Sequence, residues 1–289
     1  MKIIILVPIY NDWKSVSKLL EDINSTVSGL EYHFSIIIVN DASIEEQSIY
    51  ASNLENIQSV KIINMKENIG HARCIATGLK HIFEKEEFDY VIPMDGDGED
   101  RPEEIKNFID YIRYTSDKPI VGERVKRSEG LFFKFCYGVH KILTFAFTGQ
   151  SIKFGNYTCL PKSTVEKMIN DKATWSSFSG ALAKIEKEKS IVPSIRGSRY
   201  FGPSKMSFKN LIIHSLAIIS VFKINVLVRS ILFLAVYMVL IRQNITLIML
   251  IPLVLVIVLL TSIFSISRRE SLEALNTSLS NISGIDNIK

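Results

Sequence analysis

The chain has 289 residues, which is enough for one sizeable globular domain and a smaller part, or for two modest domains. Its formal net charge of +4 is too small to indicate a nucleic-acid-binding protein. The cysteines Cys74, Cys136 and Cys159 are far apart and form no CxxC pair, so they suggest neither a zinc site nor a disulfide framework. Charged residues are dense up to about Lys209, and the chain is then strongly apolar up to Arg268.

The first part of the chain alternates apolar, β-rich runs with helical patterns. Strands are predicted at 2–8, 35–40, 60–64, 89–94 and 119–122, and helices at 13–27 and 71–86. The opening run is too short for a signal peptide, because only five apolar residues precede Pro8 and no small-residue cleavage site follows. Near-continuous apolar strands separated by helices predict an α/β fold with a mostly parallel sheet covered on both faces.

Acidic residues follow three of these strands. Asp12 and Asp41 each come just after a strand, and a third strand ends in the cluster Asp95, Asp97, Glu99 and Asp100. In open parallel sheets, ligands bind outside the carboxyl ends of the strands. We therefore expect these acids to meet in one cleft.

The acidic cluster has three explanations. An EF-hand loop does not fit, because Asp100 stands where such a loop needs Gly and Lys106 where it needs Glu. A solvated acidic turn would suit an isolated cluster of this kind. The position after a buried strand instead favours a divalent cation, Mg²⁺ or Mn²⁺, that shares its ligands with a diphosphate. Gly96 and Gly98 leave room for such a ligand to approach the backbone.

Two apolar segments near the C-terminus predict a membrane hairpin. Residues 245–266 form 22 positions without a charge, enough to cross about 30 Å of hydrocarbon. Residues 224–241 contain Arg229 near one end, where an arginine can reach the interface. Apolar residues at helical spacing over 206–222 favour an amphipathic helix at the bilayer surface. A buried core helix is the alternative for each of these segments.

The basic residues around the hairpin predict its orientation. Lys223 and Arg229 lie at its entry and Arg268 and Arg269 at its exit, whereas Arg242 alone lies at its tip. The positive-inside tendency then places both termini and the N-terminal domain in the cytoplasm of a bacterial-type inner membrane.

Several motifs together resemble glycosyltransferase family 2. They are VPIYND (7–12), IIIVNDAS (36–43), NIGHARCIATGL (68–79), MDGDGEDRPEEI (94–105), GERVKRSEG (122–130), FGNYTCLPKSTVEKM (154–168) and RGSRYFGPSKMSF (196–208). With the hairpin after them, they resemble the polyprenyl-phosphate glycosyltransferases related to dolichyl-phosphate mannose synthase. The resemblance implies a GT-A domain over 1–205, a juxtamembrane helix over 206–222, membrane helices within 223–267 and a cytoplasmic tail over 268–289.

The resemblance also implies roles for individual residues. Nucleotide-sugar binding is expected of Pro8, Tyr10, Asp12, Asp41, Arg73 and Asp95, with Asp41 accepting from the base. Metal and diphosphate binding is expected of Asp95, Asp97 and Glu99, and catalytic roles of Asp97, Arg124 and Arg127. Acceptor-phosphate binding is expected of Arg196, Arg199, Ser204 and Lys205.

The sequence departs from the family pattern at two places. Asn40 replaces the first acid of the family's usual Asp–Asp pair, of which Asp41 is the second, and Asn156 stands where many members have an Asp proposed as catalytic base. A lipid phosphate needs no base, because its second pKa lies near 6 and it is largely dianionic at pH 7.

The predicted function is therefore inverting sugar transfer from a nucleotide-diphosphate sugar to polyprenyl phosphate. A UDP-sugar is favoured as donor, with a GDP-sugar as the second option. Alternatives are transfer to the hydroxyl of a lipid-linked saccharide in cell-surface polysaccharide assembly, or a non-catalytic membrane scaffold. Association into homo-oligomers through the membrane helices is a further hypothesis.

Overall fold

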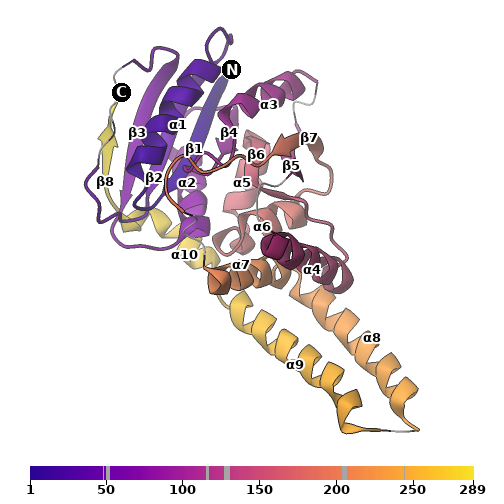
Figure 1. Ribbon diagram of the computed structural model, residues 1–289. Helices are drawn as coiled ribbons and strands as arrows, with labels where there is room; N and C mark the ends of the chain where they lie inside the picture. The colour runs from indigo at the N-terminus through magenta and orange to yellow at the C-terminus, as the bar shows by residue number, and fades with distance from the viewer. Residues whose placement is uncertain (48, 50–52, 115–116, 127–130, 204–206, 244) are drawn as a thin grey trace.

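The structure, a computed structural model, describes residues 1–289 except 48, 50–52, 115–116, 127–130, 204–206 and 244. An α/β domain lies above two helices, α4 and α7, and a long helical hairpin projects away from them (Figure 1). The strands are β1 (Lys2–Ile9), β2 (His33–Asn40), β3 (Ile57–Met65), β4 (Tyr90–Pro93), β5 (Ile120–Lys126), β6 (Phe154–Pro161), β7 (Ser190–Ile195) and β8 (Ile282–Asn287). The α-helices are α1 (Trp13–Thr26), α2 (His71–Lys85), α3 (Ile105–Ile112), α4 (Leu131–Thr148), α5 (Lys162–Ile169), α6 (Phe178–Ile185), α7 (Phe208–Ser220), α8 (Lys223–Ile241), α9 (Leu247–Ser267) and α10 (Leu272–Asn276). The 3₁₀ turns are η1 (Pro102–Glu104), η2 (Lys172–Trp175) and η3 (Ser278–Asn281).

The strands form one mixed sheet in the order β7-β5-β6-β4-β1-β2-β3-β8. The pairs β1–β2, β1–β4, β2–β3 and β5–β7 are parallel, whereas β6 runs antiparallel to β4 and β5 and β8 runs antiparallel to β3. The five strands predicted from the sequence all lie in this sheet. The prediction of a mostly parallel α/β sheet is thus confirmed.

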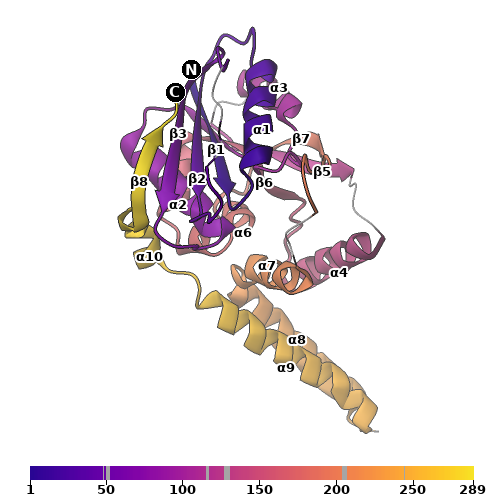
Figure 2. The same ribbon diagram turned by 60° about the vertical axis from the view of Figure 1, so that its left-hand side comes forward.

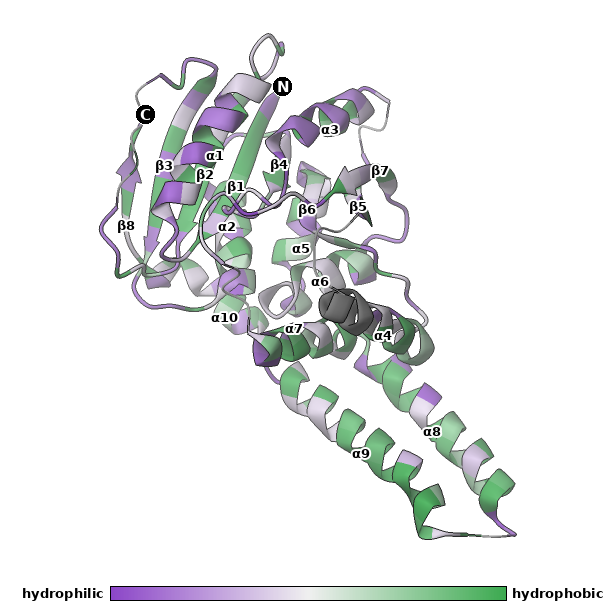
Figure 3. Ribbon diagram, viewed as in Figure 1, coloured by the Kyte–Doolittle hydropathy of each residue, from purple (hydrophilic) through white to green (hydrophobic). Residues whose placement is uncertain are grey.

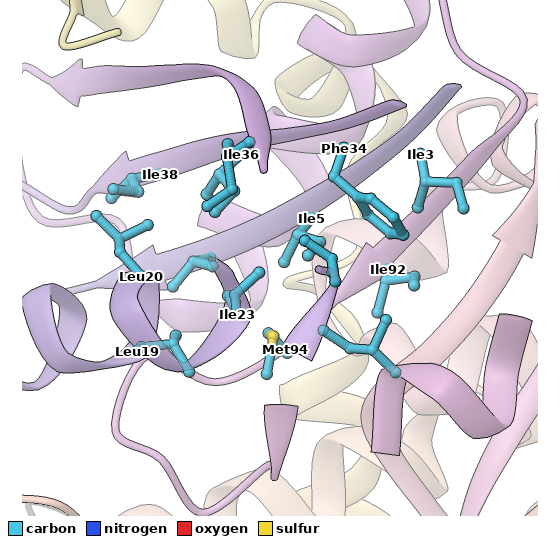
Figure 4. Packing of buried hydrophobic residues seen from close by; sticks show 14 of the residues in the cluster. Ile3, Ile5, Leu19, Leu20, Ile23, Phe34, Ile36, Ile38, Ile92 and Met94 are labelled. Carbon is cyan, nitrogen blue, oxygen red and sulfur yellow. The ribbon is translucent and has the colours of Figure 1, made fainter. Parts of the chain in front are cut away.

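Alternate residues of β1 pack on opposite faces of the sheet. Ile3 and Ile5 belong to the core beneath α1 and α3 (Figure 4), whereas Ile4 and Leu6 belong to the core beneath α2, α5 and α6. Because helices cover both faces, the strand is apolar at almost every position and not at every second one. The same arrangement leaves the strand ends as the place where polar side chains can gather.

Helices α8 and α9 form the hairpin that the two apolar segments predict. Both are long and apolar enough to cross a membrane, and only 17% and 11% of their most apolar stretches are buried in the protein. Their ribbons are almost entirely hydrophobic (Figure 3). The guanidinium of Arg229 donates to the carbonyl of Ala146 at 3.1 Å, at the C-terminus of α4. A cation at a helix C-terminus is stabilised by the exposed carbonyls there, which explains an arginine at this position in α8.

Two helices lie between the α/β domain and the hairpin. Helix α7 lies within the segment 206–222 that was predicted to be helical: its last turn, Ala217–Ser220, is buried, whereas Phe208 and Ile212 nearer its start are exposed. Helix α4 was not predicted from the sequence, and it also exposes large apolar side chains, among them Ile142 and Phe145. Both helices therefore present apolar surface next to the hairpin.

The last 22 residues return to the α/β domain. The sequence alone predicted a cytoplasmic tail over 268–289, but in the structure β8 pairs with β3 and extends the sheet at its edge. Leu275 of α10 is fully buried against Ala76 and Trp175. Because the tail pairs with the sheet, both ends of the hairpin lie on the same side as the α/β domain (Figure 1).

Candidate active site

The acidic residues predicted to converge do so at the carboxyl edge of the sheet. Strands β1, β2 and β4 are parallel, so the loops that follow them, with Asp12, Asp41 and Asp95, open at the same edge. The arrowheads of β1 and β2 point toward α7, so this edge faces the hairpin side of the molecule (Figure 2).

Two arginines neutralise the acidic cluster. Arg199, in the segment between β7 and α7, forms ion pairs with Asp12 and Asp97, and Arg196 pairs with Glu99. Each of these five side chains is less than one-fifth exposed. Partly buried ion pairs of this kind hold the carboxylates in place without any ligand.

Backbone hydrogen bonds fix the arginine segment against the acidic loop. The amide of Gly197 donates to the carbonyl of Glu99 at 2.8 Å, and the amide of Tyr200 donates to the carbonyl of Asp97 at 2.9 Å. Gly98 has a φ of +86°, and a Cβ added there would lie 2.4 Å from the Tyr200 ring. Glycine is therefore required at this position by both conformation and space.

Asp95 has partners that the sequence did not predict. Its Oδ1 lies 3.2 Å from Nε2 of His71, the first residue of α2, and accepts from the amide of Asn156 at 3.3 Å. Against the effect of burial, His71 and the nearby arginines hold the pKa of Asp95 well below its ordinary value. Against the lowering effect of desolvation, Asp95 in turn raises the pKa of His71.

The other acids of the cluster take up protons more readily. Burial and the charge of Asp95 raise the pKa of Asp97, and they raise the pKa of Asp100 to about 7. Burial also raises the pKa of Glu99, although Arg196 opposes this. Arg124 lies 4.0 Å from Asp100 and packs against Gly155. Crowded carboxylates of this kind favour a bound cation, because a positive charge relieves their repulsion.

The remaining predicted nucleotide residues lie around this edge, with one exception. Pro8 is buried in β1 and Tyr10 is exposed just after it. Both carboxylate oxygens of Asp41 accept backbone amides, from Ile69 at 2.7 Å and Gly70 at 3.0 Å.

Arg73 points away from the acidic cluster. Its guanidinium lies 5.5 Å from the centre of the Trp175 ring, beside the C-terminal tail. The predicted residues Arg127, Ser204 and Lys205 lie outside the described residues.

The donor atoms of the cluster suit a hard divalent cation. Asp95, Asp97 and Glu99 offer carboxylate oxygens. The buried Nε–H of Arg199 has no hydrogen-bond partner among the residues that the structure describes, and as a donor it suits an anion such as phosphate. In that same part of the chain, no three His, Cys, Asp or Glu side chains converge as a ready ligand set. The carboxylates alone therefore do not form a complete ligand set, and Mg²⁺ or Mn²⁺ bound here would take its other ligands from phosphate and water.

His71 is the site residue that sequence analysis missed. It follows the β3–α2 turn in the NIGHARC stretch, and its position at the first residue of a helix after a parallel strand was a usable signal. The Asn156 amide lies 2.8 Å from the His71 ring nitrogen. An amide and an imidazole thus stand beside Asp95, the amide being that of Asn156, where the resemblance led us to expect an Asp.

The mixed, mostly parallel sheet with its acid-rich carboxyl edge is of the GT-A type. The chain belongs to glycosyl transferase family 2, whose family model matches residues 4–164.

Solved structures show the same fold. Glucosyl-3-phosphoglycerate synthase from Mycobacterium tuberculosis, crystallised with Mn²⁺, UDP and glucosyl-3-phosphoglycerate, is similar with a TM-score of 0.54 and 13% identity, covering 78% of this chain and 79% of that one. The S. aureus TarS fragment 1–349 in complex with UDP-GlcNAc has a TM-score of 0.50 and 13% identity, covering 80% of this chain and 70% of that one.

Proposed function

We propose that this glycosyltransferase moves a sugar, with inversion, from a UDP-sugar to polyprenyl phosphate at the cytoplasmic face of a membrane. The observation that carries the proposal is the direction of the site. The acidic edge faces the side of the domain where α4, α7 and the apolar hairpin lie (Figures 1 and 2). A lipid acceptor whose phosphate stays near the bilayer surface could reach such a site without leaving the membrane.

The donor would bind at the carboxyl ends of β1, β2 and β4. Pro8, Tyr10, Asp12 and Asp41 would line the nucleotide pocket, and the UDP and UDP-GlcNAc bound in the similar structures favour UDP over GDP. Asp95, Asp97 and Glu99 would hold Mg²⁺ or Mn²⁺, which would supply charge stabilisation to the leaving diphosphate. The Mn²⁺ in the mycobacterial enzyme's structure supports a divalent cation.

The acceptor phosphate would bind to arginines. Arg196, Arg199 and Arg124 lie at the acidic edge. We propose the same role for Arg127, Ser204 and Lys205, which are not among the described residues. Guanidinium groups bind phosphate through two parallel hydrogen bonds. Because Asn156 cannot act as a base, a phosphate that is already ionised is a better nucleophile here than a hydroxyl group.

The orientation in the membrane follows from the tail and the charges. Since β8 pairs with β3, the tail and the catalytic domain lie on one side, and the basic residues at the hairpin base support the proposal that this side is the cytoplasm. Reporter fusions after Asn244 and after Lys289 should report opposite sides of the membrane. Two reporters on one side would contradict the hairpin.

The acceptor is tested with purified full-length protein, a panel of nucleotide sugars and undecaprenyl phosphate. We expect a product with one sugar on the lipid phosphate, its loss in excess EDTA, and a fall in rate below about pH 6 as the acceptor takes up its second proton. If only a lipid-linked saccharide accepts sugar, the acceptor is a hydroxyl group and the proposal is wrong.

A further inference from the structure

A polar hollow lies between the catalytic domain and the end of the membrane hairpin. It measures about 450 Å³. Its walls come from the loop before α2 and the first turn of that helix, from η2, and from the tail between α9 and β8. It is distinct from the acidic site. His71 faces Asp95, and Arg73, two residues further along α2 and about 200° around the helix, lines this hollow.

The walls of the hollow are rich in positive charge. Arg73, Arg268 and Arg269 line it, and Glu67 is the one acid among the lining residues that the structure describes. Among the residues that the structure describes, these three arginines form no ion pair. The guanidinium carbon of Arg73 instead lies over the Trp175 ring, 5.5 Å from its centre. A cation–π contact of this kind positions a guanidinium while leaving its N–H groups free to donate.

A buried hydroxyl group in the hollow also lacks a partner. Ser278 is 4% exposed and lines the hollow, and its Oγ has no hydrogen-bond partner among the described residues. Leaving a buried polar group unsatisfied is costly, so such a group is expected to bind a ligand or water. Three guanidinium groups and a hydroxyl group form a donor set typical of phosphate sites.

The position of the hollow indicates where the phosphate comes from. Arg268 and Arg269 directly follow Ser267, the last residue of α9, so two of the residues that line the hollow lie at the level where the proposed membrane span ends. Phosphate groups are concentrated at that level as lipid headgroups. We propose that this hollow binds the phosphate of an anionic membrane lipid and thereby fixes the tail and α2 against the bilayer surface. The proposal rests on α9 being a membrane span.

Native mass spectrometry of the full-length protein in detergent tests this, with phosphatidylglycerol and phosphatidylcholine as probes. The wild type should retain phosphatidylglycerol in preference to phosphatidylcholine. Arg73→Ala and the double variant Arg268→Ala/Arg269→Ala should each lower that retention about tenfold, because each variant loses a charge-assisted hydrogen bond to the phosphate. Ser278→Ala should lower it less. Arg242→Ala, at the opposite end of the hairpin, should retain the lipid as the wild type does.

Several outcomes would overturn the proposal. Unchanged retention in folded Arg73→Ala protein would do so, as would equal retention of both lipids. If inorganic phosphate alone stabilises the wild type but not Arg73→Ala, the ligand is a free phosphate and not a lipid. Extraction of the protein from membranes by alkaline carbonate is measured separately, and release there would show instead that α9 is no span.

Discussion

Strand β1 and helix α9 are both long apolar runs, but the fold places them in opposite surroundings. Every residue of β1 after Lys2 is buried. Along α9 only Val256, Ile263 and Ser267 are buried, whereas Leu247 and Ile248 are 85% and 77% exposed. A strand can be enclosed by a neighbour on each side and helices on both faces, whereas α9 contacts its partner α8 and helix α7 and leaves most of its other side chains exposed. Exposed apolar surface on this scale marks a site of interaction with a membrane or with another protein, so composition alone does not say where an apolar run lies.

The first prediction from the comparison of β1 with α9 is that the residues needed for sugar transfer lie in the α/β domain. Asp97→Asn should lower sugar transfer about 10³-fold, roughly 4 kcal/mol in activation free energy, because it removes a carboxylate from the proposed metal site. Initial rates with undecaprenyl phosphate measure this. Asp286→Asn, in β8 and remote from the cluster, is the control and should keep its activity. An active Asp97→Asn enzyme would remove this residue from the mechanism.

The second prediction concerns packing. Ile38→Ala should lower the free energy of unfolding by about 2–5 kcal/mol, because Ile38 is fully buried in β2 and its loss leaves a cavity. Ile257→Ala is the matched change in α9, where the side chain is 54% exposed. In detergent it should lower the free energy of unfolding by much less than Ile38→Ala does. Chemical denaturation of the detergent-solubilised protein measures both. Equal costs would mean that α9 is a core helix.

The third prediction concerns the environment of α9. Val258→Arg should disfavour insertion by about 2.5–3.5 kcal/mol, the cost of a charge near the centre of a membrane span. Gln243→Arg, at the hairpin tip, should insert normally. Glycosylation-site or protease-protection mapping of membrane-inserted protein measures this. Normal insertion of Val258→Arg would contradict a span at this depth.

The smallest predicted effect lies at the junction of the two regions. Lys223, at the start of α8, forms an ion pair with Glu270, just after α9, at 3.1 Å, and the Glu270 side chain is only 4% exposed. A double-mutant cycle with Lys223→Met and Glu270→Gln should give a coupling free energy of about 1 kcal/mol. Thermal unfolding of the four proteins measures it. Strict additivity would show that the pair does not close the base of the hairpin.

Much of the fold could be predicted because its signals are local. The apolar runs and the turns after them predicted the strands and the convergence of Asp12 and Asp95, since parallel strands end at one edge. Contacts between distant segments could not be predicted in this way. His71 beside Asp95 and the pairing of Arg199 with Asp12, 187 residues away, depend on how loops close over the sheet edge.

The sequence by itself determined the α/β fold class of the domain, the acid-rich edge of its sheet and the length of the two apolar helices. Each of these follows from residue type and period along the chain. Only the tertiary structure decided that α4 joins α7 beside the hairpin, that Arg196 and Arg199 hold the acidic cluster, and that the tail returns as β8. An edge strand such as β3 offers unpaired backbone groups to any extended segment within reach. The sequence of residues 282–287 does not indicate which strand they pair with. That pairing depends on the hairpin, which returns the chain to β3.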